Sequence, residues 1–418
     1  MKQIKVIGNR ILRGSISIPG AKNSAVALIP ASLLSDDIVE IDNVPNISDI
    51  DALNEILIYL GAKVSKKGNL MIIDSSRVVN KEIPENISKK LRASYYFMSA
   101  LLGKYKHVEM YFPGGCAIGT RPIDQTLKGF EALGAVVKQK GNKFTIKATE
   151  LKGSEVYLDM PSVGATVNTM LVAVKAKGIT VIDNAAKEPE IVNVATFLNN
   201  MGAKIRGAGT SRITITGVEK LGKCYTEVIP DRIVAGTYII AGALVGDKLR
   251  IENVIPSHIE NLLSKLKEMG VKMKIEEDYV EVSASPKLKP VSIKTLGYPG
   301  FSTDLQQPVT TLLTQCEGVS SLEETIFENR FQNVSYLNEM GANITMIGNK
   351  KIKISGKTKL YGIEVKATDL RAGVCLVLAG LVAEGTTIIK DADYILRGYE
   401  DIVGNLNNVG AKLTIEEI

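Results

Sequence analysis

Histidine is almost absent from this chain of 418 residues. Only His107 and His258 occur, and each lies beside an apolar run typical of a strand or a helix. Two isolated imidazoles argue against a Ser-His-Asp triad and against a metal site built from histidines. Acid–base chemistry in this protein would therefore fall to carboxylates, cysteine or lysine.

Cysteine is also scarce, and the four residues lie far apart: Cys116, Cys224, Cys316 and Cys375. No CxxC pair occurs, so neither a disulfide framework nor a zinc site is indicated. This usage favours a reducing, cytoplasmic location. A P-loop motif is missing, and Gly207-Ala208-Gly209 lacks the third glycine of a dinucleotide-binding fingerprint.

Long apolar runs and an excess of one charge are missing as well. No stretch reaches the ~20 apolar residues of a membrane span, and the first six residues are typical of a strand rather than a signal peptide. The 51 Lys+Arg and 45 Asp+Glu leave a net charge of +6, without basic runs interleaved with aromatics. We therefore expect no membrane span and no nucleic-acid partner. Small anionic substrates agree with this charge, and so does simple solubility.

The chain repeats one pattern six times. A hydrophobic residue followed by Gly-Ala or Gly-Val recurs around Gly61, Gly134, Gly202, Gly270, Gly341 and Gly410. The intervals between these glycines are 73, 68, 68, 71 and 69 residues. Such regularity indicates a repeat architecture, and each glycine is expected just after the end of a helix, in a left-handed conformation.

Each repeat is predicted to contain a strand, helix A, a strand, a loop, helix B and two closing strands. Helices A are expected at residues 24–34, 162–176, 233–244 and 370–383, which are rich in Ala, Gly and Leu. In the first copy, Ser48 is the expected N-cap of helix B. Leu53, Ile56, Leu57 and Leu60 follow at helical spacing and form its buried face.

The two chain ends suggest how the repeats are grouped. The last copy stops short of its closing strands, whereas the first twenty residues contain two strands without a helix. We therefore predict an α/β fold of two lobes with three repeats each. The first lobe comprises residues 21–229 and carries a mobile loop at 112–122. The second comprises residues 1–20 with 230–418 and is completed by the N-terminal strands.

Polar residues that a core would exclude recur at two places in the repeat. One place is the start of helix A, which carries Lys22, Asn23, Arg92, Ser162, Val163, Gly164, Asp231, Arg232, Asp304, Asp369 and Arg371. The other is the loop before helix B, which carries Cys116, Arg121, Glu188 and Arg397. Helix N-termini attract anions, so this pattern predicts an anion-binding cleft. Helix capping or a position in a solvated loop would explain any one of these residues. Neither explains well why a basic residue recurs at the same place in successive repeats.

One loop combines a thiol with a cation. Three glycines surround Cys116 within residues 113–122, and Arg121 follows it. A guanidinium suits phosphate or carboxylate binding, and a nearby cation lowers the pKa of a thiol. Pro122 suits the first position of a helix. The segment is thus predicted to be a mobile, reactive loop, with a glycine-rich turn holding an incidental cysteine as the alternative.

These motifs closely resemble those of the enolpyruvyl transferases over essentially the whole chain. The resemblance rests on Gly20-Ala21-Lys22-Asn23, residues 113–122, 162–166, 188–190 and 230–232, Phe327-Glu328-Asn329-Arg330-Phe331, residues 367–371 and residues 397–400. It implies two inside-out α/β barrel lobes, each of three βαβαββ repeat units, and no metal or organic cofactor. It also implies transfer of the enolpyruvyl group of phosphoenolpyruvate to the 3′-hydroxyl of UDP-N-acetylglucosamine by addition and elimination, with release of phosphate.

The resemblance also implies roles for individual residues. Cys116 would be the general acid and Asp304 would handle the hydroxyl proton, with Lys22 and Arg397 also catalytic. Phosphoenolpyruvate would contact Lys22, Asn23, Arg121, Arg371 and Arg397. The UDP-sugar would contact Arg92, Arg121, Pro122, Ile123, Asp124, Gln125, Ser162, Val163, Gly164, Asp304 and Ile326. The supporting residues would be Glu188, Asp231, Arg232 and Asp369. Thr126 departs from many relatives and Met160 from some, both at the sugar-nucleotide rim.

Three other functions remain open. An enolpyruvyl transferase acting on shikimate 3-phosphate would share the fold and chemistry but lacks the Cys116 loop motif. A non-catalytic UDP-sugar-binding paralogue would tolerate loss of Cys116, Asp304, Lys22 or Arg397, all of which are present. A thiol-redox protein would need a resolving cysteine near Cys116, and the sequence places none there. The sequence gives no prediction of oligomeric state.

Overall fold

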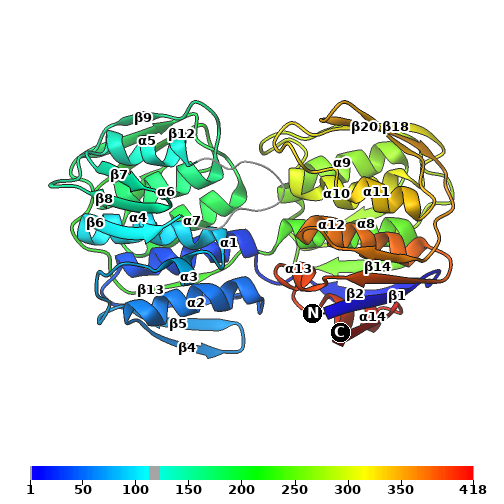
Figure 1. The fold of residues 1–418 in the computed structure, drawn as a ribbon, viewed down its shortest axis with the longest axis horizontal. Coiled ribbons are helices and arrows are strands. Elements are labelled where there is room, and N and C mark those ends of the chain that lie inside the picture. Colours follow the sequence, from blue (N-terminus) through cyan, green and yellow to red (C-terminus); the bar gives the residue numbers. More distant parts are fainter. Residues whose placement is uncertain (1, 113–122, 418) are drawn as a thin grey trace. The chain divides into compact units, whose positions relative to one another are not determined.

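The computed structural model describes residues 2–112 and 123–417. They divide into two compact units, which we call lobe 1 (residues 20–112 and 123–229) and lobe 2 (residues 2–19 and 230–417) (Figure 1). The chain passes from one lobe to the other after Pro19 and again after Ile229. No helix in these described ranges is both long and apolar enough to cross a membrane.

Lobe 1 contains helices that alternate with short strands. Its helices are α1 (Lys22–Ala31), α2 (Ser48–Leu60), α3 (Glu85–Ser88), α4 (Tyr96–Tyr105), α5 (Asp124–Ala132), α6 (Val163–Ala173) and α7 (Pro189–Asn200), with 3-10 turns η1 (Ser32–Leu34) and η2 (Arg92–Tyr95). Its strands are β3 (Ile38–Asp42), β4 (Lys63–Lys67), β5 (Leu70–Asp74), β6 (His107–Tyr111), β7 (Val136–Lys140), β8 (Lys143–Lys147), β9 (Glu155–Tyr157), β10 (Ile179–Asp183), β11 (Lys204–Arg206), β12 (Arg212–Thr216) and β13 (Cys224–Glu227).

Lobe 2 repeats this arrangement. Its helices are α8 (Arg232–Val245), α9 (Glu260–Met269), α10 (Gln306–Leu313), α11 (Asn333–Glu339), α12 (Leu370–Val382), α13 (Asp393–Leu396) and α14 (Ile402–Asn408), with 3-10 turns η3 (Pro256–Ile259) and η4 (Thr303–Leu305). Its strands are β1 (Lys2–Ile7), β2 (Leu12–Ser17), β14 (Gly246–Glu252), β15 (Lys272–Ile275), β16 (Tyr279–Ser283), β17 (Ser292–Lys294), β18 (Gly318–Glu323), β19 (Ile344–Ile347), β20 (Lys351–Gly356), β21 (Glu364–Lys366), β22 (Thr386–Lys390) and β23 (Lys412–Glu417).

The strands of each lobe form three small sheets. In lobe 1 the strand orders are β13-β3-β5-β4, β6-β8-β7 and β11-β12-β10-β9. In lobe 2 they are β15-β16-β14-β2, β17-β18-β20-β19 and β21-β22-β1-β23. Within a repeat, the strand before helix A runs parallel to the strand after it, and the closing hairpin pairs antiparallel. The predicted α/β fold of six βαβαββ repeats is confirmed.

Three strands pair with strands of a repeat that is distant along the chain. β1 pairs antiparallel with both β22 and β23, so it takes the place of a closing strand in the last repeat. β2 pairs parallel with β14, and β13 pairs parallel with β3. Each passage between the lobes therefore falls between a strand and the helix A that follows it in sequence.

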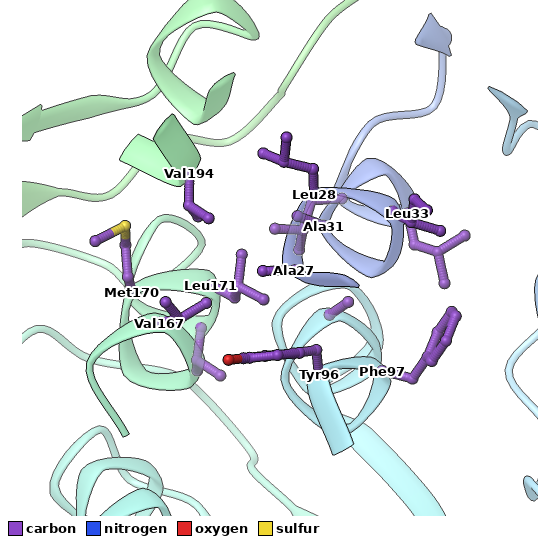
Figure 2. Packing of buried hydrophobic residues seen from close by; sticks show 14 of the residues in the cluster. Ala27, Leu28, Ala31, Leu33, Tyr96, Phe97, Val167, Met170, Leu171 and Val194 are labelled. Carbon is purple, nitrogen blue, oxygen red and sulfur yellow. The ribbon is translucent and has the colours of Figure 1, made fainter. Parts of the chain in front are cut away.

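The helices A form the centre of each lobe, inside the sheets. In lobe 1, α1, α4 and α6 meet, and Figure 2 shows Ala27, Tyr96, Val167 and Leu171 gathered between them. Every residue is buried over 24–31 in α1 and over 165–173 in α6, as expected for helices without a solvent face. The sequence predicts four of the six helices A, corresponding to α1, α6, α8 and α12, and misses α4 and α10.

Each helix B ends just before the repeated glycine. All six glycines have positive φ, between 83° and 110°, which confirms the predicted left-handed turn. The predicted N-cap of the first helix B is wrong by one residue. Ser48 is already helical, and Ile47 is the cap residue, with extended backbone and no side-chain capping bond.

Candidate active-site residues

In lobe 2, Asp304 lies between two arginines. Its Oδ1 is 2.6 Å from Nη2 of Arg330, and its Oδ2 is 3.2 Å from Nη2 of Arg371. The two guanidinium side chains are only 3% and 6% exposed, whereas that of Asp304 is 24% exposed. Two buried cations thus face one carboxylate that solvent can reach. The trio carries a net positive charge and is suited to receive an anion.

Arg371 is held by further contacts. It is the second residue of α12, whose N-cap Asp369 accepts a hydrogen bond from the Arg371 main-chain N–H at 2.8 Å. Its Nη1 donates to the Tyr399 hydroxyl at 3.0 Å, and that oxygen lies 2.8 Å from Oγ1 of Thr237. Burial opposes the charged form of Arg371, but Tyr399 and Asp304 outweigh it, so the pKa of the guanidinium lies above its usual value. Arg371 therefore remains a cation.

The supporting residues predicted in this lobe lie at helix starts. Asp231 caps α8 and accepts hydrogen bonds from the main-chain N–H groups of Ile233 and Val234 at 2.8 and 3.0 Å. Arg232 begins the same helix and lies over the Tyr298 ring, 5.5 Å from its centroid. The geometry gives Asp231, like Asp369, a capping role that orients the first turn of its helix.

Two more predicted residues of lobe 2 lie in loops. Arg397 follows α13 directly and is half-buried. Ile326 follows β18 and is 42% exposed. The same loop continues to Arg330, so Ile326 and the partner of Asp304 belong to one segment.

In lobe 1, Lys22 is fixed by an acidic residue from another helix. Lys22 and Asn23 begin α1, and Nζ of Lys22 is 2.5 Å from Oδ2 of Asp49 in the first turn of α2. The two side chains are 16% and 4% exposed, while Asn23 is exposed. A lysine held at the N-terminus of a ten-residue helix, with that helix's free N–H groups, favours binding of phosphate or carboxylate.

The first turn of α6 lies against the segment that carries Arg92. Ser162 caps α6, and its Oγ accepts a hydrogen bond from the Ala165 N–H at 3.2 Å. A Cβ on Gly164 would come within 2.0 Å of the Tyr95 hydroxyl, so only glycine is compatible with this packing. Tyr95 and Arg92 belong to the same 3-10 turn. The predicted UDP-sugar residues Arg92 and 162–164 therefore lie on two segments in direct contact.

The start of α5 is bound to a neighbouring loop. Gln125 is 9% exposed, and its Oε1 accepts a hydrogen bond from the Asp159 N–H at 2.8 Å. Its Nε2 donates to Oδ2 of Asp159 and to Oδ2 of Asp124, both at 3.0 Å. Ile123 is buried, whereas Asp124 is exposed. Because the Gln125 amide already has protein partners, a ligand at this turn would meet Asp124 and the main chain first. Glu188 caps α7.

The comparisons with known proteins agree over the whole chain. The sequence model for EPSP synthase (3-phosphoshikimate 1-carboxyvinyltransferase) matches residues 6–406. The chain belongs to this family of enzymes, the enolpyruvyl transferases. It is 51% identical over 423 residues to UDP-N-acetylglucosamine 1-carboxyvinyltransferase 2 of Geobacillus kaustophilus, covering 100% of this chain and 99% of that one. A protein of the same name from Streptococcus mutans is 51% identical over 419 residues and 100% of both chains.

Solved structures give the same fold for this enolpyruvyl transferase. The enolpyruvyl transferase NikO from Streptomyces tendae superposes with a TM-score of 0.90 at 25% identity, over 99% of both chains. EPSP synthase from Acinetobacter baumannii has a TM-score of 0.77 at 18% identity over 100% of both chains and supports the fold alone. The predicted family and fold are confirmed.

Three contacts of this enolpyruvyl transferase were not predicted from sequence. Arg330 and Tyr399 lie inside motifs that carry the resemblance, whereas Asp49 lies in none of these motifs. The structure gives each a partner, namely Asp304, Arg371 and Lys22. The family motifs were the available signal for Arg330 and Tyr399. No sequence feature indicates the contact of Asp49 with Lys22.

Cys116, Arg121 and Pro122 lie outside the described residues, as does the predicted mobile loop from residue 113 onward. Their roles remain predictions. The three described cysteines are buried. Burial raises the pKa of Cys224, of Cys316 and of Cys375 to about 11. None of these three thiols has the character of a nucleophile at neutral pH.

Proposed function

We propose that this enolpyruvyl transferase moves the enolpyruvyl group of phosphoenolpyruvate to the 3′-hydroxyl of UDP-N-acetylglucosamine, with release of phosphate. This is the first committed step of peptidoglycan synthesis. The acceptor is supported by full-length relatives at 51% identity whose names state it. The chemistry is supported by Asp304 held between Arg330 and Arg371, because it places a proton acceptor beside two anion-binding groups.

In this proposal, addition comes first. Asp304 takes the proton of the sugar hydroxyl, whose oxygen forms a bond to C-2 of phosphoenolpyruvate, while Cys116 delivers a proton to C-3. In elimination, the bond between C-2 and the phosphate oxygen breaks and C-3 loses a proton, which restores the double bond. Lys22, Arg121, Arg371 and Arg397 hold the phosphate and carboxylate groups of the substrate.

The contacts of Asp304 suggest how the substrate prepares the base. Both carboxylate oxygens are engaged by arginines. A substrate carboxylate or phosphate that binds Arg371 competes with Oδ2 of Asp304 for the same guanidinium. Substrate binding thus frees one oxygen of Asp304 to accept the hydroxyl proton.

The predicted contacts of the UDP-sugar belong to this proposal. They are Arg92, residues 121–125, residues 162–164, Asp304 and Ile326. The capped N-terminus of α6, with eleven helical residues behind it, supports binding of the diphosphate there. Neither a metal nor an organic cofactor takes part in this proposal. The expected cytoplasmic location stays a prediction.

Phosphate release from phosphoenolpyruvate tests this function directly. It is measured with UDP-N-acetylglucosamine or shikimate 3-phosphate as acceptor, for the unaltered protein and for Cys116→Ser. We expect release only with the UDP-sugar, and loss of that release in the variant. Release only with shikimate 3-phosphate would make the protein an EPSP synthase instead. UDP-sugar binding without release under any condition would indicate a non-catalytic paralogue.

A further inference from the structure

Glu324 is a buried carboxylate that the catalytic proposal does not use. It follows β18 directly and is 1% exposed. Its Oε1 accepts hydrogen bonds from the main-chain N–H groups of Ile326 and Phe327 at 2.8 and 3.1 Å. The hydroxyl of Thr295 donates to the same oxygen at 3.0 Å, and the hydroxyl of Thr303 donates to Oε2 at 2.9 Å. A buried charge is costly unless it is well hydrogen-bonded, so these four donors explain why it is tolerated.

Three of the four donors come from two segments that converge on Asp304, and the fourth, Thr295, directly follows β17. Thr303 is the immediate neighbour of Asp304 in the turn η4. Ile326 and Phe327 begin the loop that continues to Arg330, whose Nη2 lies 2.6 Å from Oδ1 of Asp304. Glu324 therefore connects the segment that carries the proposed base with the segment that carries its arginine partner. Ile326, a predicted UDP-sugar contact, lies on the second segment.

Neighbouring bonds make this anchor rigid. The main-chain N–H of Thr325 donates to Oγ1 of Thr295 at 2.9 Å, and the Thr325 hydroxyl donates to the Thr295 carbonyl at 2.6 Å. The N–H of Glu324 itself donates to the carbonyl of Lys350 at 2.8 Å. The main chain at Glu324 and at Thr325 is thus hydrogen-bonded to adjacent segments. The Glu324 side chain therefore holds Thr303 in a fixed place relative to these segments.

We propose that Glu324 is a positioning residue, which sets the distance between Asp304 and the loop that carries Ile326 and Arg330. The claim rests on the proposed function, because it assigns Asp304 to proton transfer and Ile326 to the UDP-sugar. Misplacing a catalytic group by a fraction of the contact distance lowers the rate steeply even when the fold persists.

Two substitutions of Glu324 distinguish the effect of its hydrogen bonds from the effect of its negative charge. Glu324→Ala removes all four acceptor contacts, so the Thr303 segment and the Ile326 segment lose their common anchor. Glu324→Gln retains one carbonyl oxygen for Ile326, Phe327 and Thr295. Its amide group would face Thr303, whose hydroxyl can accept as well as donate. The glutamine is therefore expected to preserve the geometry without the negative charge.

Two threonine variants provide the matched comparison. Thr303→Val removes only the link between Glu324 and the segment of Asp304. Thr358→Val is the control, because Thr358 lies in the same lobe, is also half-buried, and donates a hydroxyl hydrogen bond to a main-chain carbonyl, that of Thr314. Both replacements have the same shape and lose one hydroxyl, but only the first acts on Asp304.

The experiment is steady-state phosphate release with saturating phosphoenolpyruvate and varied UDP-N-acetylglucosamine, at a temperature where circular dichroism shows each variant folded. We expect kcat/KM to fall about tenfold or more in Glu324→Ala and to stay within about threefold of the unaltered protein in Glu324→Gln. Thr303→Val should lower kcat with little change in KM, and Thr358→Val should change neither. Glu324→Ala with kinetics like those of Thr358→Val would overturn the proposal, as would Glu324→Gln as impaired as Glu324→Ala.

A second measurement does not depend on the reaction. Hydrogen exchange at the amides of Ile326 and Phe327 should accelerate in Glu324→Ala and remain slow in Thr303→Val, which keeps both amide contacts. If the unaltered protein fails to turn over UDP-N-acetylglucosamine, the proposed function fails, whereas the exchange rates still decide whether Glu324 holds this loop. Unchanged exchange in Glu324→Ala would overturn the positioning role itself.

Discussion

At the scale of single residues, the three described thiols share one kind of environment. Cys224, Cys316 and Cys375 are buried, and burial raises the pKa of each to about 11. Since the thiolate is the nucleophile, we expect iodoacetamide or the epoxide fosfomycin to modify the native protein once, at Cys116. Native Cys116→Ser protein should stay unmodified until it is denatured. Intact-protein mass spectrometry measures this, and an adduct on native Cys116→Ser would contradict the prediction.

Gly164 offers a second test at a single residue. The Cβ of Gly164→Ala would lie 2.0 Å from the Tyr95 hydroxyl, so either the Tyr95 ring or the first turn of α6 must shift. Overpacking of this kind costs about 1–3 kcal/mol. We expect a higher KM for UDP-N-acetylglucosamine and a smaller change in KM for phosphoenolpyruvate.

The double variant Gly164→Ala, Tyr95→Phe is the control for this clash. It removes the hydroxyl oxygen, and the next ring atom lies at 3.0 Å from the new Cβ. Part of the UDP-sugar affinity should return. If the double variant binds the UDP-sugar no better than Gly164→Ala alone, the clash with Tyr95 is not the cause of the defect.

The candidate site shows which residues sequence can place. Ser162, Asp231 and Asp369 are helix N-caps, and local patterning places them at helix starts because a cap depends on its own next three residues. The pairs formed by Asp49 with Lys22 and by Arg330 with Asp304 join residues 27 and 26 positions apart. Such contacts follow from how elements pack, and no local pattern encodes them.

At the scale of elements, an asparagine links helix B to the edge strand in three of the repeats. Asn199, Asn338 and Asn407 each stand three residues before the repeated glycine. Each side chain donates to the carbonyl and accepts from the N–H of one buried strand residue, respectively Ile205, Ile344 and Leu413, at distances of 2.7 to 3.0 Å. The asparagine therefore satisfies main-chain groups that an edge strand would leave unpaired.

Removing one of these amides should weaken its repeat. Asn199→Ala leaves both main-chain groups of Ile205 without their partner, and we expect the free energy of unfolding to fall by about 1–3 kcal/mol. Asn200→Ala, at the exposed neighbouring position of α7, is the control and should change it by less than about 0.5 kcal/mol. Denaturant titration measures both, and equal stabilities of the two variants would remove the bridging role.

At the scale of the whole molecule, the glycine repeat predicts the architecture because every copy has the same requirement at its helix end. Gly61 and its five equivalents all adopt positive φ. The apolar pattern does not predict α4 and α10. Their first turns carry polar or aromatic residues, such as Tyr96 and Gln306, which only the packed lobe buries. The chain-end argument assigns β2 to the second lobe, but it does not predict that β2 pairs with β14 or that β13 pairs with β3, since that pairing is a property of the complete lobe.

The position of β1 leads to the last prediction. Ile4 is fully buried and lies opposite Ile389 of β22 and Ile415 of β23, so the N-terminal strand joins two strands near the other end of the chain. Ile4→Ala should cost about 2–5 kcal/mol of stability. Lys5→Ala, on the other face and paired with Glu416 at 2.8 Å, should cost about 0–1 kcal/mol.

The loss in Ile4→Ala should be confined to one lobe. Hydrogen exchange followed by mass spectrometry should show faster exchange in β22 and β23, which pair with β1, and unchanged exchange in β3 and β5. This follows because β1 belongs to the sheet β21-β22-β1-β23 of lobe 2, while β3 and β5 belong to a sheet of lobe 1 with its own core. Equal acceleration in both sheets would instead mean that the lobes unfold as a single cooperative unit, despite the separate cores that the fold gives them.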